Sequence, residues 1–179
     1  MNETYYPPGA FRFTVTVIGA GTVLTALTGI DASFQEVSGI QVEFGVEEVA
    51  EGGENRFVHR LPKQAKYSPL VLKRGVVTTA SALGEWVGAT IGAPLSLPIV
   101  PQNLLVTLLN GDNLPLIAWG FSNAYPLKWQ TAPLNSMENN VLIETMELSY
   151  NFFVRLTLGS PAAAAASLAS LASKLQGAV

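Results

Sequence analysis

Alternation of apolar and polar residues recurs along most of the chain and restricts its possible folds more than any other feature. Residues 11–17 read Phe-Arg-Phe-Thr-Val-Thr-Val, and residues 40–46 place four apolar side chains on one face. A period of two is typical of a β-strand with one buried face. Further strands are expected over residues 56–61, 70–72, 104–109, 116–121 and 141–158. The sequence therefore predicts one mainly β domain, built as a sandwich or a barrel.

A single helix is expected in the middle of the chain. Over residues 83–91 the side chains recur at the spacing of one helix face, and Thr79 or Ser81 can cap its start. Gly92 and Pro94 are expected to end the helix.

Three short segments predict how the strands are connected. Ser38-Gly39 is typical of a turn, and Asn110-Gly-Asp-Asn113 is typical of the turn of a β-hairpin. Pro62 is expected to end its strand or to restrict it to a sheet edge, because proline cannot donate a backbone hydrogen bond.

The composition changes after Gly159. Ser160 and Pro161 suit the first positions of a helix, and a run of alanines with spaced leucines follows them. One interpretation is an Ala-rich tail without fixed structure, and the other is a helix that docks during assembly. We therefore divide the chain into a domain of residues 1–158 and a C-terminal extension of residues 159–179.

The chain has many apolar residues and few charges for its size. Of 179 residues, 49% are apolar and 13% are charged, which argues against disorder. Such a chain is expected to cover apolar surface with a partner, for which another subunit is the simplest candidate. The net charge of −3 argues against specific nucleic-acid binding.

We expect neither a signal peptide nor a membrane-spanning segment in this sequence. Residues 1–8 contain no basic segment followed by an apolar stretch, so a signal peptide is not expected. Residues 80–100 are interrupted by Glu85, Pro94 and Pro98, which makes them a poor membrane span. We expect no membrane anchoring.

The residues needed for catalysis are scarce. His59 is the only histidine, and Asp31 and Asp112 are the only aspartates, so a nucleophile with a base and an orienting acid cannot be assembled. The absence of cysteine excludes disulfides and thiolate metal sites. Five glutamates between residues 43 and 54 resemble a solvated loop more than a catalytic pair, although a small hydrolase that uses them is an alternative. We expect no enzymatic activity, no cofactor and no metal.

Charges of opposite sign follow one another in the first half of the chain. After the glutamates between residues 43 and 54 come six basic residues: Arg56, Arg60, Lys63, Lys66, Lys73 and Arg74. They could form screened ion pairs within one subunit. Alternatively, one end of the subunit is acidic and the other basic, so that copies stack head to tail. The apolar excess favours assembly.

Several longer segments occur in an order that resembles a known family. They are Phe34-Gln-Glu-Val-Ser-Gly-Ile40, Glu51-Gly-Gly-Glu-Asn55, Lys66-Tyr-Ser-Pro-Leu-Val-Leu-Lys-Arg-Gly75, Asn123-Ala-Tyr-Pro-Leu-Lys-Trp129 and Ile143-Glu-Thr-Met-Glu-Leu148. Over about residues 11–156, the chain resembles the tail-tube family of T4-like contractile phages, which extracellular contractile injection systems share.

This resemblance implies a fold of two packed antiparallel sheets with one α-helix. It also implies a structural role: six copies form a ring around a channel, and the rings stack coaxially inside a contractile sheath. Such a protein would be assembled in the cytoplasm and released as part of a phage tail or an injection particle. Whether DNA or a protein passes through the channel is left open.

The resemblance also implies where subunits touch. Residues 46–57 would form an extended loop that reaches a neighbouring subunit or ring, and its glutamates would meet the basic Lys73-Arg74 segment of that neighbour. The residues expected at these contacts are Glu47, Glu48, Glu51, Gly52, Gly53, Glu54, Asn55, Arg56, Lys73 and Arg74.

Two roles within the family are open. One protein polymerises into the bulk of the tube, and a related one forms the first ring on the baseplate hub and spike. The opening Tyr5-Tyr-Pro-Pro8, together with Glu51–Leu61 and Lys66–Gly75, resembles the initiator type of injection systems. The extension beyond Gly159 departs from a repeating tube subunit, which also favours the initiator. A secreted ring-forming protein of a related secretion system is the remaining alternative.

Overall fold

The computed structural model describes residues 9, 12–18, 30–31, 34–53, 56–76, 81–92, 94, 98–137, 140–157 and 170. These residues form ten strands and one helix. The strands are β1 (Phe13–Ile18), β2 (Ile30–Asp31), β3 (Phe34–Ser38), β4 (Val42–Val49), β5 (His59–Tyr67), β6 (Leu70–Gly75), β7 (Gln102–Leu109), β8 (Pro115–Thr131), β9 (Ile143–Ser149) and β10 (Phe152–Thr157), and the helix is α1 (Ala82–Ile91). The expectations for residues 1–8 and for the C-terminal extension lie outside the described residues, apart from Ser170.

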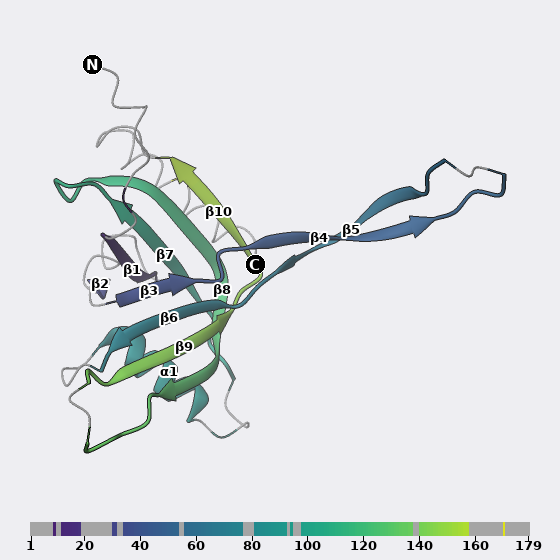
Figure 1. The fold of residues 1–179 in the computed structure, drawn as a ribbon. Helices are drawn as coiled ribbons and strands as arrows, with labels where there is room; N and C mark the ends of the chain where they lie inside the picture. The colour runs from purple at the N-terminus through teal and green to yellow at the C-terminus, as the bar shows by residue number, and fades with distance from the viewer. Residues whose placement is uncertain are drawn as a thin grey trace.

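Strand β8 belongs to two sheets. Its first part pairs with β7 and β10, and its last part pairs with β9. The hydrogen-bonded order β2-β1-β7-β8-β9-β6-β3 therefore folds over at β8 into two antiparallel sheets that face each other (Figure 1). This arrangement confirms the expected fold of two sheets and one helix.

Alternate side chains of both sheets form a common core. Strand β6 buries Leu70 and Leu72, which lie beside Met146 and Leu148 of β9 in the register of the sheet. The facing sheet contributes aliphatic residues from β1 and β7 and the ring of Phe121 from β8. The period-two pattern of the sequence thus becomes a buried face on each sheet.

The helix begins and ends where the sequence predicts. Ser81 caps it, because its side-chain oxygen accepts a hydrogen bond of 3.1 Å from the backbone N–H of Gly84. At the other end, the N–H of Gly92 donates to the carbonyl of Gly88. The helix packs against β8, and none of the helices in the described part of the chain is long and apolar enough to cross a membrane.

The last strand is predicted as one element over residues 141–158, but it is two. The chain leaves the ladder at Tyr150 and Asn151, where the ring of Tyr150 enters the core and Asn151 N–H donates to the carbonyl of Ser122. The partner strand β8 contains Pro126 near this point, and its register shifts between Pro126 and Lys128. Strand β8 changes partner at the same place, because Ser122 pairs with Phe152 of β10 and Tyr125 pairs with Ser149 of β9.

The chain leaves β3 through a turn that requires glycine. Gly39 has a φ of +86°, and a Cβ at this position would lie 1.9 Å from the carbonyl oxygen of Pro69. The hydroxyl of Tyr150 donates to the Gly39 carbonyl over 3.4 Å. This turn confirms the predicted Ser38-Gly39 signal and directs the chain out of the body into β4.

Candidate assembly site

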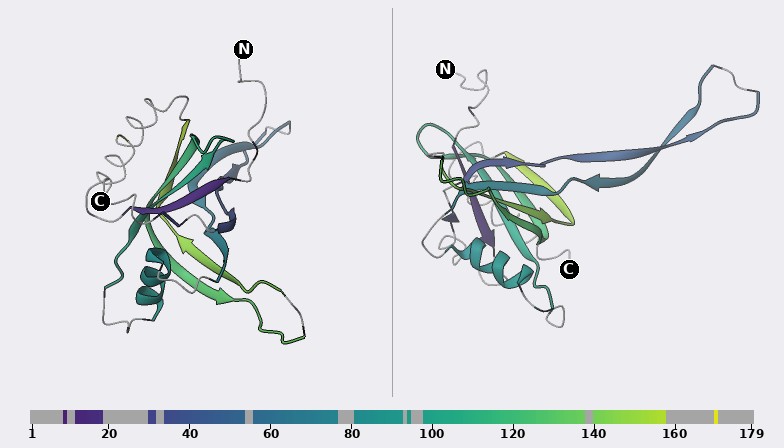
Figure 2. Two further views of the ribbon diagram at one scale, coloured as in Figure 1. Left: turned by 90° about the vertical axis from the view of Figure 1, so that its left-hand side faces the viewer. Right: turned by 60° about the horizontal axis from the view of Figure 1, so that its bottom comes forward.

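A two-stranded ribbon projects from the body of the subunit. Among the described strands, β4 and β5 pair only with each other. Figure 1 and the right view of Figure 2 show the ribbon extending away from the two sheets. We call residues 42–67 the arm. Near its tip Gly53 has a φ of +96°, a conformation that favours glycine and suits a sharp reversal.

The arm carries apolar side chains that its own subunit does not cover. Among the described arm residues, seven large apolar side chains are at least 40% exposed: Val42, Phe44, Val46, Val49, Phe57, Val58 and Leu61. The alternation over residues 40–46 predicts a strand with a buried face, and the strand forms, but Phe44 is 66% exposed. An isolated two-stranded ribbon is marginally stable in water, so the arm requires a covering surface.

The charges of the arm pair along its own length. Glu48 faces Arg60 across the ribbon at 3.2 Å, and Glu47 lies 3.4 Å from Lys63. Glu51 lies 3.5 Å from the ring nitrogen of His59. The order of acidic and basic residues in the sequence therefore reflects the two strands of one hairpin. Each exposed pair stabilises the ribbon by no more than about 1 kcal/mol.

Pro62 lies within β5 and pairs in register with Val46. The prediction that this proline is at a sheet edge is confirmed, because both strands of a two-stranded ribbon are edges. The missing N–H costs little at an edge, and the register shifts between Phe44 and Val46 close to this position.

The predicted basic contact residues lie in the body, not on the arm. Lys73 donates to the Glu36 carboxylate of the adjacent strand β3 over 2.9 Å. This hydrogen bond, with the positive charge of Lys73, holds the pKa of Glu36 below its ordinary value. Arg74 points to the opposite face and is only 3% exposed. Within its own subunit Arg74 has the partners Glu144 and Ser81, and its contact with a neighbour's glutamates stays a prediction.

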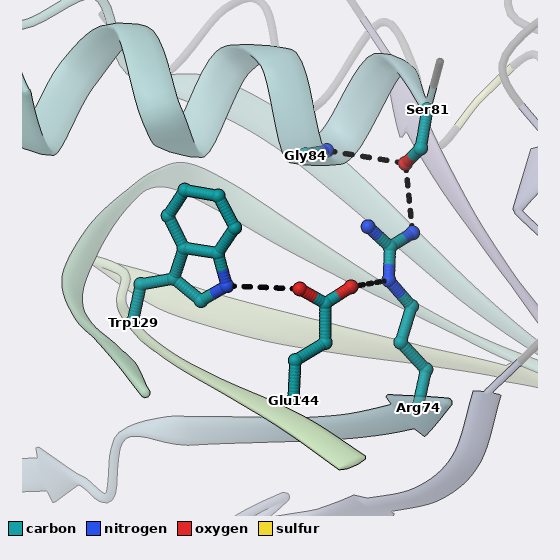
Figure 3. Close-up of polar contacts among 5 residues, drawn as sticks. All are labelled: Arg74, Ser81, Gly84, Trp129 and Glu144. Atoms are coloured by element: carbon teal, nitrogen blue, oxygen red, sulfur yellow. Dashed lines mark hydrogen bonds and ion pairs between the residues drawn. The ribbon is translucent and has the colours of Figure 1, made fainter. Parts of the chain in front are cut away.

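A buried polar network surrounds Arg74 (Figure 3). Its Nε donates to the Glu144 carboxylate, and its Nη1 donates to the Ser81 hydroxyl over 2.7 Å. The Trp129 indole N–H donates to the other Glu144 oxygen over 3.0 Å. The network joins β6, β9 and β8 to the start of α1. Gly84 allows the Arg74 guanidinium to lie close to the first turn of the helix, because a Cβ at position 84 would lie 3.0 Å from the guanidinium.

The Ser81 hydroxyl serves the network twice, as helix cap and as acceptor for Arg74. We expect Ser81→Ala to lower the free energy of unfolding by about 1–2 kcal/mol, since a cap and a hydrogen bond to a charged group are both lost. Ser81→Thr retains the hydroxyl oxygen, so its free energy of unfolding should fall much less. Urea denaturation of the two variants measures the difference, and equal stability would contradict this role.

The structure brings only part of the predicted contact set together. Glu47, Glu48, Glu51, Gly52, Gly53 and Arg56 lie on the arm, Lys73 and Arg74 lie in the body, and Glu54 and Asn55 lie outside the described residues. The prediction omits the exposed apolar residues of the arm. The sequence feature that could have revealed these residues is a stripe of apolar side chains within a segment that is otherwise highly charged.

The acidic residues of the described part of the chain are paired or dispersed. The described residues hold no group of three or more histidine, aspartate or glutamate side chains that could bind a metal ion. Glu144 and Arg74 neutralise each other in the interior, and the glutamates of the arm are spread along a ribbon.

Solved structures with the same fold come from contractile injection particles. A chain in the cryo-EM structure of the anti-feeding prophage baseplate is 30% identical, with a TM-score of 0.73, over 87% of this chain and 99% of that one. A chain of the anti-feeding prophage tube terminating cap is 23% identical, with a TM-score of 0.69, over 88% and 99%. A chain of the PVC sheath–tube complex in the extended state is 21% identical, with a TM-score of 0.69, over 86% and 94%.

Sequence comparison gives the family directly. Comparison with curated proteins gives no match. The model of the family described as T4-like virus tail tube protein gp19, however, matches residues 9–154. Because this match spans most of the chain and agrees with the fold, the protein belongs to the T4-like virus tail tube gp19 family.

Proposed function

We propose that this protein forms a hexameric ring of the inner tube of a contractile injection system or phage tail, at the baseplate end where it initiates the tube. Its proposed partners are further copies in the ring, the adjacent tube ring, hub and spike proteins of the baseplate, and the surrounding sheath. Assembly takes place in the cytoplasm, and the particle is then released. The role is structural.

The observation that carries this proposal is the uncovered arm. Seven of its large apolar side chains are at least 40% exposed, and Glu47 and Glu48 are already paired with Lys63 and Arg60. Association with a second copy removes this apolar surface from water, which is the main driving force for protein assembly. The proposed contact residues are those of the arm: Val42, Phe44 and Val46, with Glu47, Glu48, Glu51, Gly52, Gly53, Glu54, Asn55 and Arg56 around them.

The initiator position is supported by the comparison with solved structures. The chain from a baseplate structure is 30% identical to this protein, whereas the chain from a sheath–tube complex is 21% identical. A bulk tube subunit and a secreted ring-forming protein remain the alternative roles, and both would use the same fold. The three roles differ in what the purified protein assembles into.

Negative-stain electron microscopy of the purified protein, alone and mixed with a tube subunit of the same particle, tests the proposal. An initiator is expected to give single rings, and tubes only when the second protein is added. Long tubes from this protein alone would identify a bulk tube subunit. Monomers under both conditions would overturn the ring-forming role itself.

A further inference from the structure

Exposed large apolar side chains gather in two parts of the molecule. One group lies on the arm. In the described part of the chain the others, apart from Leu114, lie at the end of the body that contains α1, at the bottom of Figure 1. We call this second group the apolar end: Val76, Ile91, Ile99, Val100, Leu127, Trp129, Leu134, Met137 and Val141.

The apolar end contains a groove of about 420 Å³ beside the helix. Its walls are the last turns of α1 with Ile91, the segment that contains Ile99 and Val100, and Leu127 of β8. None of the described side chains that line the groove is charged. The volume is sufficient for two or more large apolar side chains.

The two polar side chains among the described residues that line the groove have hydrogen-bond partners. The Trp86 indole N–H donates to the Val100 carbonyl over 3.1 Å, which ties the 98–100 segment to the helix. The Thr90 hydroxyl donates to the Trp86 carbonyl over 2.8 Å. Three prolines also line the groove and bring no N–H of their own. The groove therefore presents a mainly apolar set of side chains to a ligand.

The arm has the properties of a ligand for this groove. Phe44 is its most exposed apolar side chain. The nearby charges Glu47 and Glu48 are paired with Lys63 and Arg60, so these two carboxylates already have a cation beside them when the apolar residues dock. In Figure 1 and in the right view of Figure 2 the arm extends away from α1, so it does not cover the groove of its own subunit.

We propose that the groove between α1, residues 98–100 and β8 is the receptor for the arm of a second copy, with Phe44 as the residue that enters it. This inference rests on the proposed ring-forming role and specifies its contact. Ligand and receptor are different surfaces of the same chain, so the contact is heterologous and can be repeated from copy to copy. It replaces the expected acidic-to-basic contact with an apolar one, which fits the internal pairing of Lys73 and Arg74.

Engineered cysteines test the contact, because the chain contains no cysteine of its own. A Phe44→Cys protein is mixed with an Ile99→Cys protein and oxidised, and the products are separated on a non-reducing gel. A disulfide forms only where the two Cα atoms approach within about 7 Å. We expect a covalent dimer that contains one copy of each variant, and a ladder of higher products from the Phe44→Cys/Ile99→Cys double variant.

Leu134→Cys is the matched control for the groove position. Leu134 is 84% exposed at the same end of the body but does not line the groove, so it should not cross-link to Phe44→Cys. Rings seen by electron microscopy without a 44–99 cross-link, or with equal cross-linking to position 134, would overturn the inference and leave the proposed function standing. Absence of rings under every condition would overturn both.

Discussion

Arg74→Met lowers the free energy of unfolding by about 3–5 kcal/mol, because it leaves the Glu144 carboxylate buried without its cation. For a domain of this size, such a loss lowers the melting temperature by about 10 °C or more. Lys73→Met is the matched control on the same strand. Its ion pair with Glu36 is partly exposed, so the change should cost no more than about 1 kcal/mol. Urea denaturation of both variants and the unmodified protein measures the two effects.

A double variant separates charge from shape at this site. If the loss in Arg74→Met comes from the unpaired carboxylate, then Arg74→Met/Glu144→Leu recovers most of it, because both charges have been removed from the interior. A double variant as unstable as Arg74→Met would show that the loss comes from packing around the guanidinium. Equal stability of Arg74→Met and Lys73→Met would contradict the role of the buried pair.

Phe44→Glu should abolish assembly while the subunit stays folded. The side chain is 66% exposed, so its replacement removes little from the subunit, but a carboxylate in an apolar contact must be desolvated. In a ring the same cost recurs at every interface, so even about 2 kcal/mol per contact, roughly a 30-fold change in each association constant, suppresses closure of the ring. Sedimentation velocity and circular dichroism measure assembly and folding on the same sample.

Two controls make this result specific. Phe44→Leu preserves an apolar side chain and should assemble. Gln64→Glu adds the same charge on the neighbouring position of the ribbon, next to Ala65, which faces Phe44 in the register, and it should also assemble. Loss of assembly in Gln64→Glu would indicate that any added negative charge on the arm is harmful, and the apolar contact would then be wrong.

Much of the fold could be predicted because a strand with one buried face shows alternating apolar and polar residues in the sequence. The strands alternate, and Ser81 and Gly92 bound the helix as their chemistry requires. The interruption at Tyr150 and Asn151 could not be predicted, since the alternation runs on through both residues. It coincides with the change of partner along β8 between Ser122 and Tyr125, which are neighbours of these residues in space only.

The site was harder to predict, for two reasons. Residues 40–46 show an apolar face, but a local pattern does not tell whether the same subunit or another one covers that face. Lys73 and Arg74 read as one basic pair, yet adjacent residues of a strand point to opposite faces. The alternation of Leu70, Leu72 and Arg74 does carry this signal, and it places the arginine on the buried face.

Strand β8 also has a mechanical consequence. Its 17 residues run from the β7–β8 turn to the end of the body that contains α1, an extended length of about 55 Å (Figure 1). A compressive force between these two ends is therefore carried by the covalent backbone of β8. The hydrogen bonds to β7, β9 and β10 support the strand laterally against buckling. A compressive load along this direction would pass through β8, and the register shift between Pro126 and Lys128 is a position where its lateral bracing is interrupted.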